Sequence, residues 1–131
     1  MSQSIQALHD QLIARLKAGK FTEGIREFYA ADATAQENSG PLSHGRDEMA
    51  SNEERFQKKV TAFHGINVHA TAIDDHGGGS GVVMYECTMR WSQNDREGIV
   101  AVDQSVVERW KNGKITAIRF YGNYEPGELP T

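Results

Sequence analysis

The stretch Gly98–Tyr124, GIVAVDQSVVERWKNGKITAIRFYGNY, decides the fold of this chain. Two runs rich in β-branched and aromatic residues lie on either side of Asn112-Gly113. An Asn-Gly pair between two such runs is a strong hairpin signal, because both central positions of a type I′ turn need a positive φ. The stretch therefore predicts two long antiparallel strands, Gly98–Lys111 and Lys114–Asn123.

Two further runs before this hairpin are also typical of strands. They are Ala62–Ile73 and Gly81–Ser92, and the segments after them, Asp74–Ser80 and Gln93–Glu97, are rich in turn residues. Together with the hairpin they predict a four-stranded antiparallel meander. Strands of this length coil strongly, because each strand has a right-handed twist.

Three helices are predicted before the meander from their apolar spacing and end signals. They span residues 4–18, about Thr22–Ala30 and about Arg46–Val60, and the run Ala33–Asn38 predicts a short strand between the last two. Helices followed by an antiparallel sheet predict an α+β fold with the helices on one face. A coiled sheet around such helices forms a cone with an apolar interior.

Composition limits the class of protein. The 131 residues, 38% hydrophobic and 24% charged, are typical of one globular domain spanning residues 1–131. The net charge of −4 gives no electrostatic basis for binding nucleic acid or an anionic membrane. No apolar run approaches a membrane span, and the N-terminus lacks a signal-peptide core. The single cysteine, Cys87, excludes an internal disulfide framework and suits the cytoplasm.

The order of elements resembles the NTF2-like superfamily, in particular its SnoaL-like and ketosteroid-isomerase-like members with the cystatin-like fold. The resemblance lies in four segments: LKAGKF (Leu16–Phe21), FYAADAT (Phe28–Thr34), GRDEM (Gly45–Met49) and RWKNGKI (Arg109–Ile115). It implies a cone of three N-terminal helices packed on a strongly curved antiparallel sheet, and a homodimer. It does not fix an activity, because this fold hosts isomerases, cyclases, hydratases, epoxide hydrolases and binding domains.

Glu37 is the first candidate for chemistry. It follows Asp32-Ala33-Thr34 at the spacing where ketosteroid isomerases, as the resemblance implies, place a general-base aspartate. A partly desolvated carboxylate at a pocket mouth can move a proton, because burial raises its pKa towards neutrality. The alternative is a solvated glutamate at the end of a strand.

A second acid depends on the register of the strand before the Asn-Gly turn. Counting back from the turn places Val106 at the family's acid position, whereas a bulge would place Asp103 there. The family's tyrosine position on the first helix reads Leu12. Strand alternation puts Glu108 on one face and Asp103 on the other, and the resemblance favours Glu108 inward. The alternative pairs Glu108 with an arginine on a neighbouring strand, Arg90 or Arg119.

The expected pocket wall is aromatic. Tyr85 and Trp91 share the apolar face of the strand Gly81–Ser92, and Trp110 and Phe120 join them from the hairpin. His44, in the loop before the third helix, is a candidate proton carrier or ligand donor, with an ordinary loop histidine as the alternative. The histidines and cysteine lack metal-ligand spacing, so we expect neither a metal nor a cofactor.

These observations predict a SnoaL-like protein that binds an apolar small molecule in a cone-shaped pocket. Its expected chemistry is cofactor-independent proton transfer at a carbonyl, as in isomerisation, cyclisation or dehydration. Glu37 would be the base, and Glu108 or Asp103 the acid or orienting group. The alternative is a non-catalytic ligand-binding or dimerising domain, for which Val107 and Tyr121 mark the outer face of the sheet.

Overall fold

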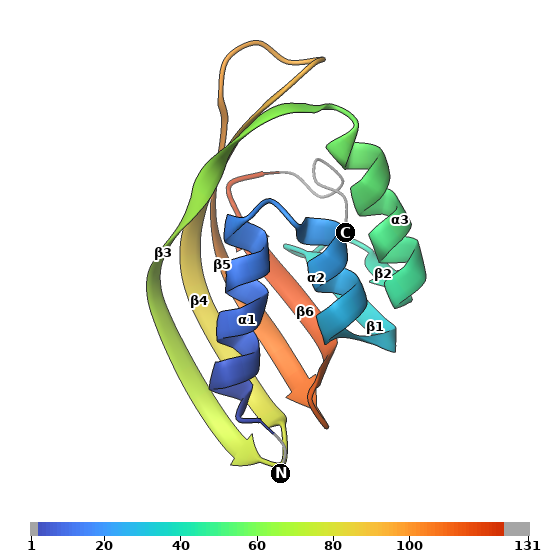
Figure 1. Cartoon of the computed structure of the whole chain (residues 1–131), viewed down its shortest axis with the longest axis vertical. Helices are drawn as coiled ribbons and strands as arrows, with labels where there is room; N and C mark the ends of the chain where they lie inside the picture. The colour runs from blue at the N-terminus through green and yellow to red at the C-terminus, as the bar shows by residue number, and fades with distance from the viewer. Residues whose placement is uncertain (1–2, 125–131) are drawn as a thin grey trace.

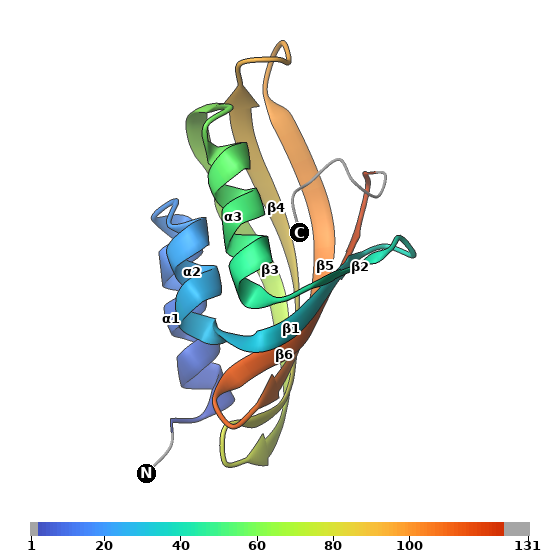
Figure 2. The ribbon, with the colours of Figure 1, turned by 90° about the vertical axis from the view of Figure 1, so that its right-hand side faces the viewer.

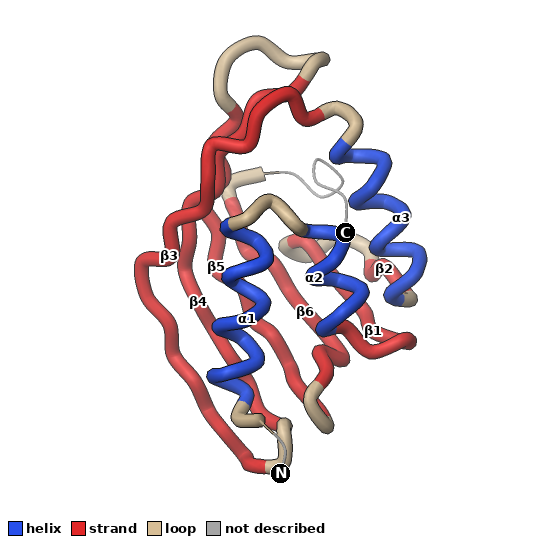
Figure 3. The backbone as a smooth tube through the Cα atoms, viewed as in Figure 1, coloured by secondary structure: helices blue, strands red, loops and turns tan. Residues whose placement is uncertain are grey.

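A computed structural model of the chain describes residues 3–124. In this range the chain forms the helices α1 (Ile5–Lys17), α2 (Phe21–Phe28) and α3 (Arg46–Gln57). The strands are β1 (Tyr29–Glu37), β2 (Leu42–His44), β3 (Val60–Gly77), β4 (Ser80–Gln93), β5 (Val100–Lys111) and β6 (Lys114–Gly122). Figure 3 follows these elements along the backbone. No helix within residues 3–124 is long and apolar enough to cross a membrane.

The predicted meander is confirmed, and two more strands extend it. The sheet has the order β2-β1-β6-β5-β4-β3, in which only the pairing of β1 with β6 is parallel and the other described pairs are antiparallel. Asn112 and Gly113 join β5 to β6 with φ angles of 52° and 81°. Both angles are positive, as the Asn-Gly pair requires.

All three helices lie against one face of this sheet, which the two views show as separate layers (Figure 1, Figure 2). Helix α1 begins after Ser4, whose side-chain oxygen accepts a hydrogen bond from the Ala7 N–H at 3.1 Å. This contact satisfies one of the free N–H groups of the first turn. In both views the helix layer covers the concave side of the sheet, as predicted for an α+β cone.

Irregular pairing accounts for the curvature of the outer strand. The β3–β4 register shifts at four places, including the one between Phe63 and Gly65, where Gly65 has a φ of 115°. A bulge places two residues opposite one and bends its strand, and a positive φ is accessible to glycine without steric cost. β3 therefore bends around the helices instead of continuing flat.

Several boundaries differ from the sequence-based expectation. β1 begins at Tyr29 instead of Ala33, and α3 ends at Gln57, so that Val60 opens β3. β3 continues to Gly77, past the turn expected from Asp74, because a tight glycine turn at positive φ suffices to reverse the chain. β2 was not expected at all. It is a three-residue strand that pairs with β1 and contains His44.

The core lies between α1 and the inner faces of β4, β5 and β6. Its fully buried members include Ile5 from α1, Val83 from β4, Val106 from β5 and Ile115 from β6. Each side chain of this size contributes roughly 1.5–3 kcal/mol by leaving water. Burial along β5 alternates residue by residue, with Glu108 inside and Asp103 outside. The structure thereby decides which of these two acids faces the helices.

Candidate functional site

A cavity of about 120 Å³ lies between the helix layer and the concave face of the sheet. Its wall is mostly apolar and aromatic. The described residues that line it are Leu12, Leu16, Phe21, Ile25, Tyr29, Ala35, Met49, Glu53, Phe56, Val60, Phe63, Ile66, Tyr85, Met89, Trp91, Gln104, Glu108, Ile118 and Phe120. An apolar pocket with a few convergent polar groups is the usual form of a small-molecule site.

Glu108 is the most deeply buried acid in this wall, with no exposed surface. Its Oε1 atom lies 2.8 Å from His9 Nδ1 and accepts the indole N–H of Trp110 at 3.0 Å. Trp110 reaches the same oxygen because residues two apart share a strand face. The Oε2 atom of Glu108 is buried without a hydrogen-bond partner among residues 3–124. One oxygen of the carboxyl group is thus held and the other is left for a ligand.

His9 was not among the site residues expected from the sequence. It is 2% exposed, and it lies one turn after Ile5 on the apolar face of α1. Glu108 Oε1 thus has two partners, the Trp110 N–H from its own strand and His9 Nδ1 from α1. The alternative in which Glu108 pairs with Arg90 or Arg119 is wrong.

Two tyrosines stand beside this carboxyl group. Burial raises the pKa of Tyr29 and that of Tyr85, and the nearby charge of Glu108 raises both further. Both hydroxyls therefore stay protonated and remain hydrogen-bond donors. Neither hydroxyl has a hydrogen-bond partner in the described part of the chain. Both side chains line the cavity, so a ligand oxygen could accept from either.

Glu53 brings a second carboxyl group to the cavity and was also missed. It is 8% exposed on α3, between Met49 and Phe56 at helical spacing. Its Oε1 atom accepts a hydrogen bond from Gln57 Nε2 at 2.7 Å. Burial raises the pKa of Glu53, and the bond from Gln57 partly offsets this rise. An acid in the middle of the apolar stripe Met49–Phe56–Val60 is the sequence signal that could have revealed it.

Glu37 is buried, but it is not among the described residues that line the cavity. Burial raises the pKa of Tyr124, and the nearby charge of Glu37 raises it further. The Tyr124 hydroxyl donates to Gln104 Oε1 at 3.1 Å, and Gln104 does line the cavity. The structure thus places Glu37 in the protein interior but not among the described residues of the wall that holds Glu108.

Asp103 lies on the other face of β5, and the expectation that it could reach the cone is wrong. It is exposed, and its Oδ1 atom accepts the Thr88 hydroxyl at 2.6 Å. The same Thr88 oxygen lies 2.8 Å from His69 Nε2. No bulge shifts the β4–β5 register between Gly81 and Trp91, so alternation holds along the whole pair. Val106, not Asp103, therefore shares the inner face with Glu108.

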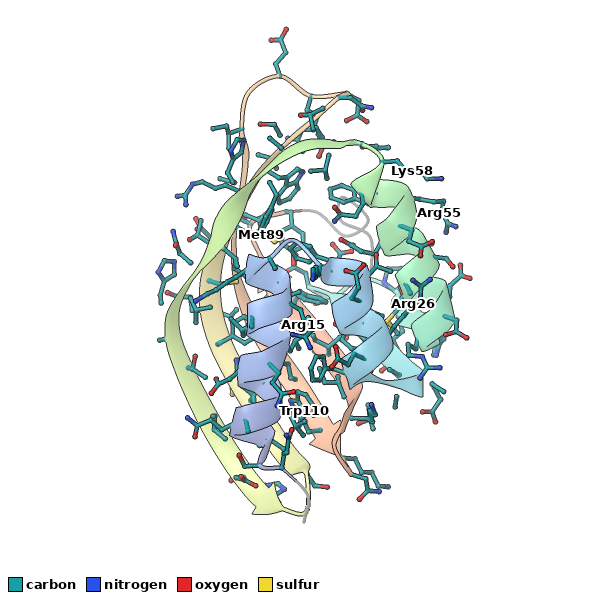
Figure 4. All side chains as sticks on the ribbon, in the orientation of Figure 1. Arg15, Arg26, Arg55, Lys58, Met89 and Trp110 are labelled. Atoms are coloured by element: carbon teal, nitrogen blue, oxygen red, sulfur yellow. The ribbon has the colours of Figure 1, made fainter. Side chains whose placement is uncertain are left out.

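The expected binding residues divide into three groups. Tyr85, Trp91 and Phe120 line the cavity. Trp110 lies behind this wall, where its ring packs edge-on against Phe28 at 6.3 Å while its N–H holds Glu108. Figure 4 shows Trp110 near the first turns of α1. His44 is exposed on β2 and lines no part of the cavity.

The chemistry available here is that of acids, a histidine and tyrosines. Residues 3–124 contain no group of three or more histidine, cysteine, aspartate or glutamate side chains placed to hold a metal ion. Cys87 is buried, its Sγ atom lies 3.6 Å from Gln104 Nε2, and burial raises the pKa of its thiol. A thiol with a raised pKa is a poor nucleophile.

Comparisons with known proteins agree on the fold. No family model and no curated protein matches this chain. A proposed SnoaL-like polyketide cyclase from Jannaschia sp. CCS1 superposes with a TM-score of 0.71 at 12% identity, covering 94% of this chain and 91% of that chain. An LEH-like epoxide hydrolase from M. tuberculosis gives 0.71 at 18% identity, covering 91% and 82%.

A third similar structure is an NTF2-like protein of unknown function from Burkholderia xenovorans LB400. It gives a TM-score of 0.65 at 20% identity and covers 94% of this chain and 88% of that chain. The predicted NTF2-like α+β fold, with three helices on a curved sheet, is therefore confirmed. At these identities the similarity establishes the fold, and one fold hosts many activities.

Proposed function

We propose that the cavity binds an apolar small molecule and that Glu108 moves a proton on a carbonyl-bearing ligand without a cofactor. The observation that carries this proposal is the state of Glu108: fully buried, held through Oε1 by His9 and Trp110, and lining an apolar cavity. A base held in a fixed position in a low-dielectric site is well suited to proton transfer.

The proposed step is enolisation. The Glu108 carboxylate removes a proton from the carbon next to the ligand carbonyl, and the electrons of that C–H bond form the enolate. The Tyr29 and Tyr85 hydroxyls donate hydrogen bonds to the developing oxygen charge. Returning the proton from Glu108 to a different carbon completes an isomerisation, and cyclisation or dehydration would begin from the same enolate.

In this proposal Glu108 replaces Glu37 as the base. Glu37 remains a candidate for positioning, since it is buried near Tyr124, whose hydroxyl bonds the Gln104 that lines the cavity. His9 and Trp110 are positioning residues, because they contact the carboxyl group of Glu108 and are not among the described residues that line the cavity. We also propose that the protein is cytoplasmic, which the free, buried Cys87 supports.

The test is exchange of α-hydrogen for deuterium in an apolar ketone. Wild-type protein is incubated with 2-tetralone in D₂O, and the α-proton signal is followed by NMR. We expect Glu108→Gln to slow protein-dependent exchange about 100-fold or more. Glu86→Gln, which changes an exposed acid on β4, is the matched control and should leave the rate unchanged. Equal rates for wild type and Glu108→Gln would refute Glu108 as the base.

The alternative is a non-catalytic binding or dimerising domain, and one observation favours a dimer. Met84 and Tyr121, on the sheet face away from the helices, are 52% and 43% exposed. Exposed apolar side chains on one face are typical of an interaction surface. Sedimentation velocity at two concentrations tests the dimer, and a monomer at both would contradict it. Ketone binding without any exchange would favour the non-catalytic alternative.

A further inference from the structure

The described wall of the cavity contains acidic side chains but no basic ones, and the proposed proton transfer involves only one of the acids. Its described lining residues include two acids, Glu53 and Glu108, and no lysine, arginine or histidine. Glu108 has the partners His9 and Trp110. Glu53 has the neutral amide of Gln57, and no ion pair in residues 3–124 includes Glu53.

The cations near Glu53 are directed elsewhere. Arg26 of α2 pairs with Glu54 at 2.7 Å, and both side chains are about half exposed. Arg55 hydrogen-bonds Asn52, and Lys58 is exposed after the end of α3. Figure 4 shows Arg55 and Lys58 at the outer edge of α3. The carboxyl group of Glu53 is therefore on the cavity side of α3 and the positive charges are on the solvent side.

The described cavity residues from other elements bring no cation to Glu53 either. Tyr29 of β1 lies near both acids, because the charges of Glu108 and Glu53 raise its pKa. A buried carboxylate without a cation is costly, and a cation that enters with a ligand would remove this cost. A positive charge on a ligand would therefore be a partner for the ionised form of Glu53.

The aromatic part of the wall favours the same ligand. Phe56, one turn after Glu53 on α3, packs edge-on against Trp91 at 5.7 Å, and Phe21 packs against Phe63 at 5.3 Å. All four rings line the cavity. The faces of aromatic rings attract cations, most strongly where water is excluded. An ammonium group beside Glu53 would meet both a carboxylate and ring faces.

We propose that the cavity selects an apolar molecule that carries a protonated amine, with the carboxylate of Glu53 as its counter-ion. This inference rests on the proposed function only in that the cavity is a ligand site, and it is independent of proton transfer by Glu108. The cavity should accept neutral ligands more weakly and reject carboxylic acids, whose charge would add to those of Glu53 and Glu108.

The test compares three ligands that differ in one group: octylamine, 1-octanol and octanoate. Calorimetry at pH 7 should show octylamine binding about tenfold more tightly than 1-octanol, and octanoate more weakly than either. Glu53→Gln should reduce the affinity for octylamine to that for 1-octanol. Retained 1-octanol binding would show that this variant keeps its cavity. The control Glu54→Gln, which changes the exposed neighbour, should keep the preference for octylamine.

The affinity for octylamine should also depend on pH. Binding of an ammonium group requires ionised Glu53, so the affinity should rise with pH through the raised pKa of Glu53 and become flat in Glu53→Gln. Equal affinities of wild type for octylamine and 1-octanol, or a preference that survives Glu53→Gln, would overturn the inference. If none of the three ligands binds, both this inference and the proposed ligand site are wrong. If ketone exchange fails but the amine preference is found, only the proposed enzymatic activity is wrong.

Discussion

Glu108 and Asp103 lie five residues apart on the same strand, and their surroundings are opposite. Glu108 is on the inner face of β5, fully buried and held by a histidine from α1 and a tryptophan from its own strand. Asp103 is on the outer face, exposed and bonded to the hydroxyl of Thr88. Residues an odd number of positions apart on a strand point to opposite faces, and the helix layer covers only one face of β5. The spacing of five therefore puts one acid in the interior and the other in solvent.

This contrast shows what a buried acid needs that a surface acid does not. Water solvates Asp103, whereas Glu108 depends on hydrogen bonds from other parts of the chain. Removing one partner of a buried pair leaves a charge or polar group that nothing else satisfies. The inner and outer faces of β5 should therefore respond very differently to single substitutions.

The largest change in the free energy of unfolding should come from substituting His9. His9→Leu leaves Glu108 buried without its closest partner, and we expect a loss of about 3 kcal/mol in the free energy of unfolding. Urea denaturation measures it. The double variant His9→Leu/Glu108→Leu should be more stable than His9→Leu alone, because no carboxyl group remains unpaired. A loss below about 1 kcal/mol for His9→Leu would show that the pair is not coupled.

A smaller effect is expected for the second partner. Trp110→Phe removes the N–H that bonds Glu108 Oε1 but keeps an aromatic ring against Phe28. We expect a loss of about 2 kcal/mol by urea denaturation, because hydrogen bonds to charged groups contribute roughly 1.5–3 kcal/mol. Trp91→Phe is the matched control, since the Trp91 N–H bonds the partly exposed Gln93. A greater loss for Trp91→Phe would contradict the assignment.

Substituting Glu53 should mainly change how the free energy of unfolding depends on pH. The folded-state pKa of Glu53 is raised by burial, so the folded protein holds this proton more tightly than the unfolded chain. Its contribution is present below the ordinary glutamate pKa and is lost as the pH rises through the raised value. Glu53→Gln should therefore gain stability relative to wild type between acid and neutral pH. Thermal unfolding at several pH values tests this, and parallel pH profiles for the two proteins would contradict it.

The smallest effect should come from the outer face. Asp103→Asn keeps an oxygen that can accept the Thr88 hydroxyl and removes a solvated charge. We expect the free energy of unfolding to change by no more than about 0.5 kcal/mol. A loss in urea denaturation as large as that of His9→Leu would show that the two faces of β5 are not different in the way described here.

The sequence predicted those features of the fold that are determined by residues close together in the chain. The hairpin was predictable because the φ requirement of Asn112-Gly113 is a property of two residues. Strand alternation put Glu108 and Asp103 on opposite faces, but only the family resemblance favoured Glu108 inward, and Asp103 stayed an alternative until the register was known. β2 gave no signal, because three residues cannot show a period.

The site itself was only partly predictable, for a different reason. His9 and Glu53 are buried at positions where their helices are otherwise apolar. From residue type alone, polar side chains of this kind are predicted to be exposed to solvent. Their partners lie on other elements, at Glu108 and around the cavity, so only the packed structure shows why they are buried. A polar residue inside an apolar stripe was the signal that the sequence did contain.

Glu108 lines a cavity, and we propose that this cavity admits an apolar ligand. The most direct measurement is an NMR titration of ¹⁵N-labelled protein with 2-tetralone that follows the two indole N–H signals, assigned with Trp91→Phe and Trp110→Phe. We predict that both signals shift saturably, because Trp91 lines the cavity and Trp110 bonds Glu108, while the backbone amides of Asp103 and Tyr121 stay unchanged. Saturable shifts at Asp103 and Tyr121 with no movement of Trp110 would contradict it.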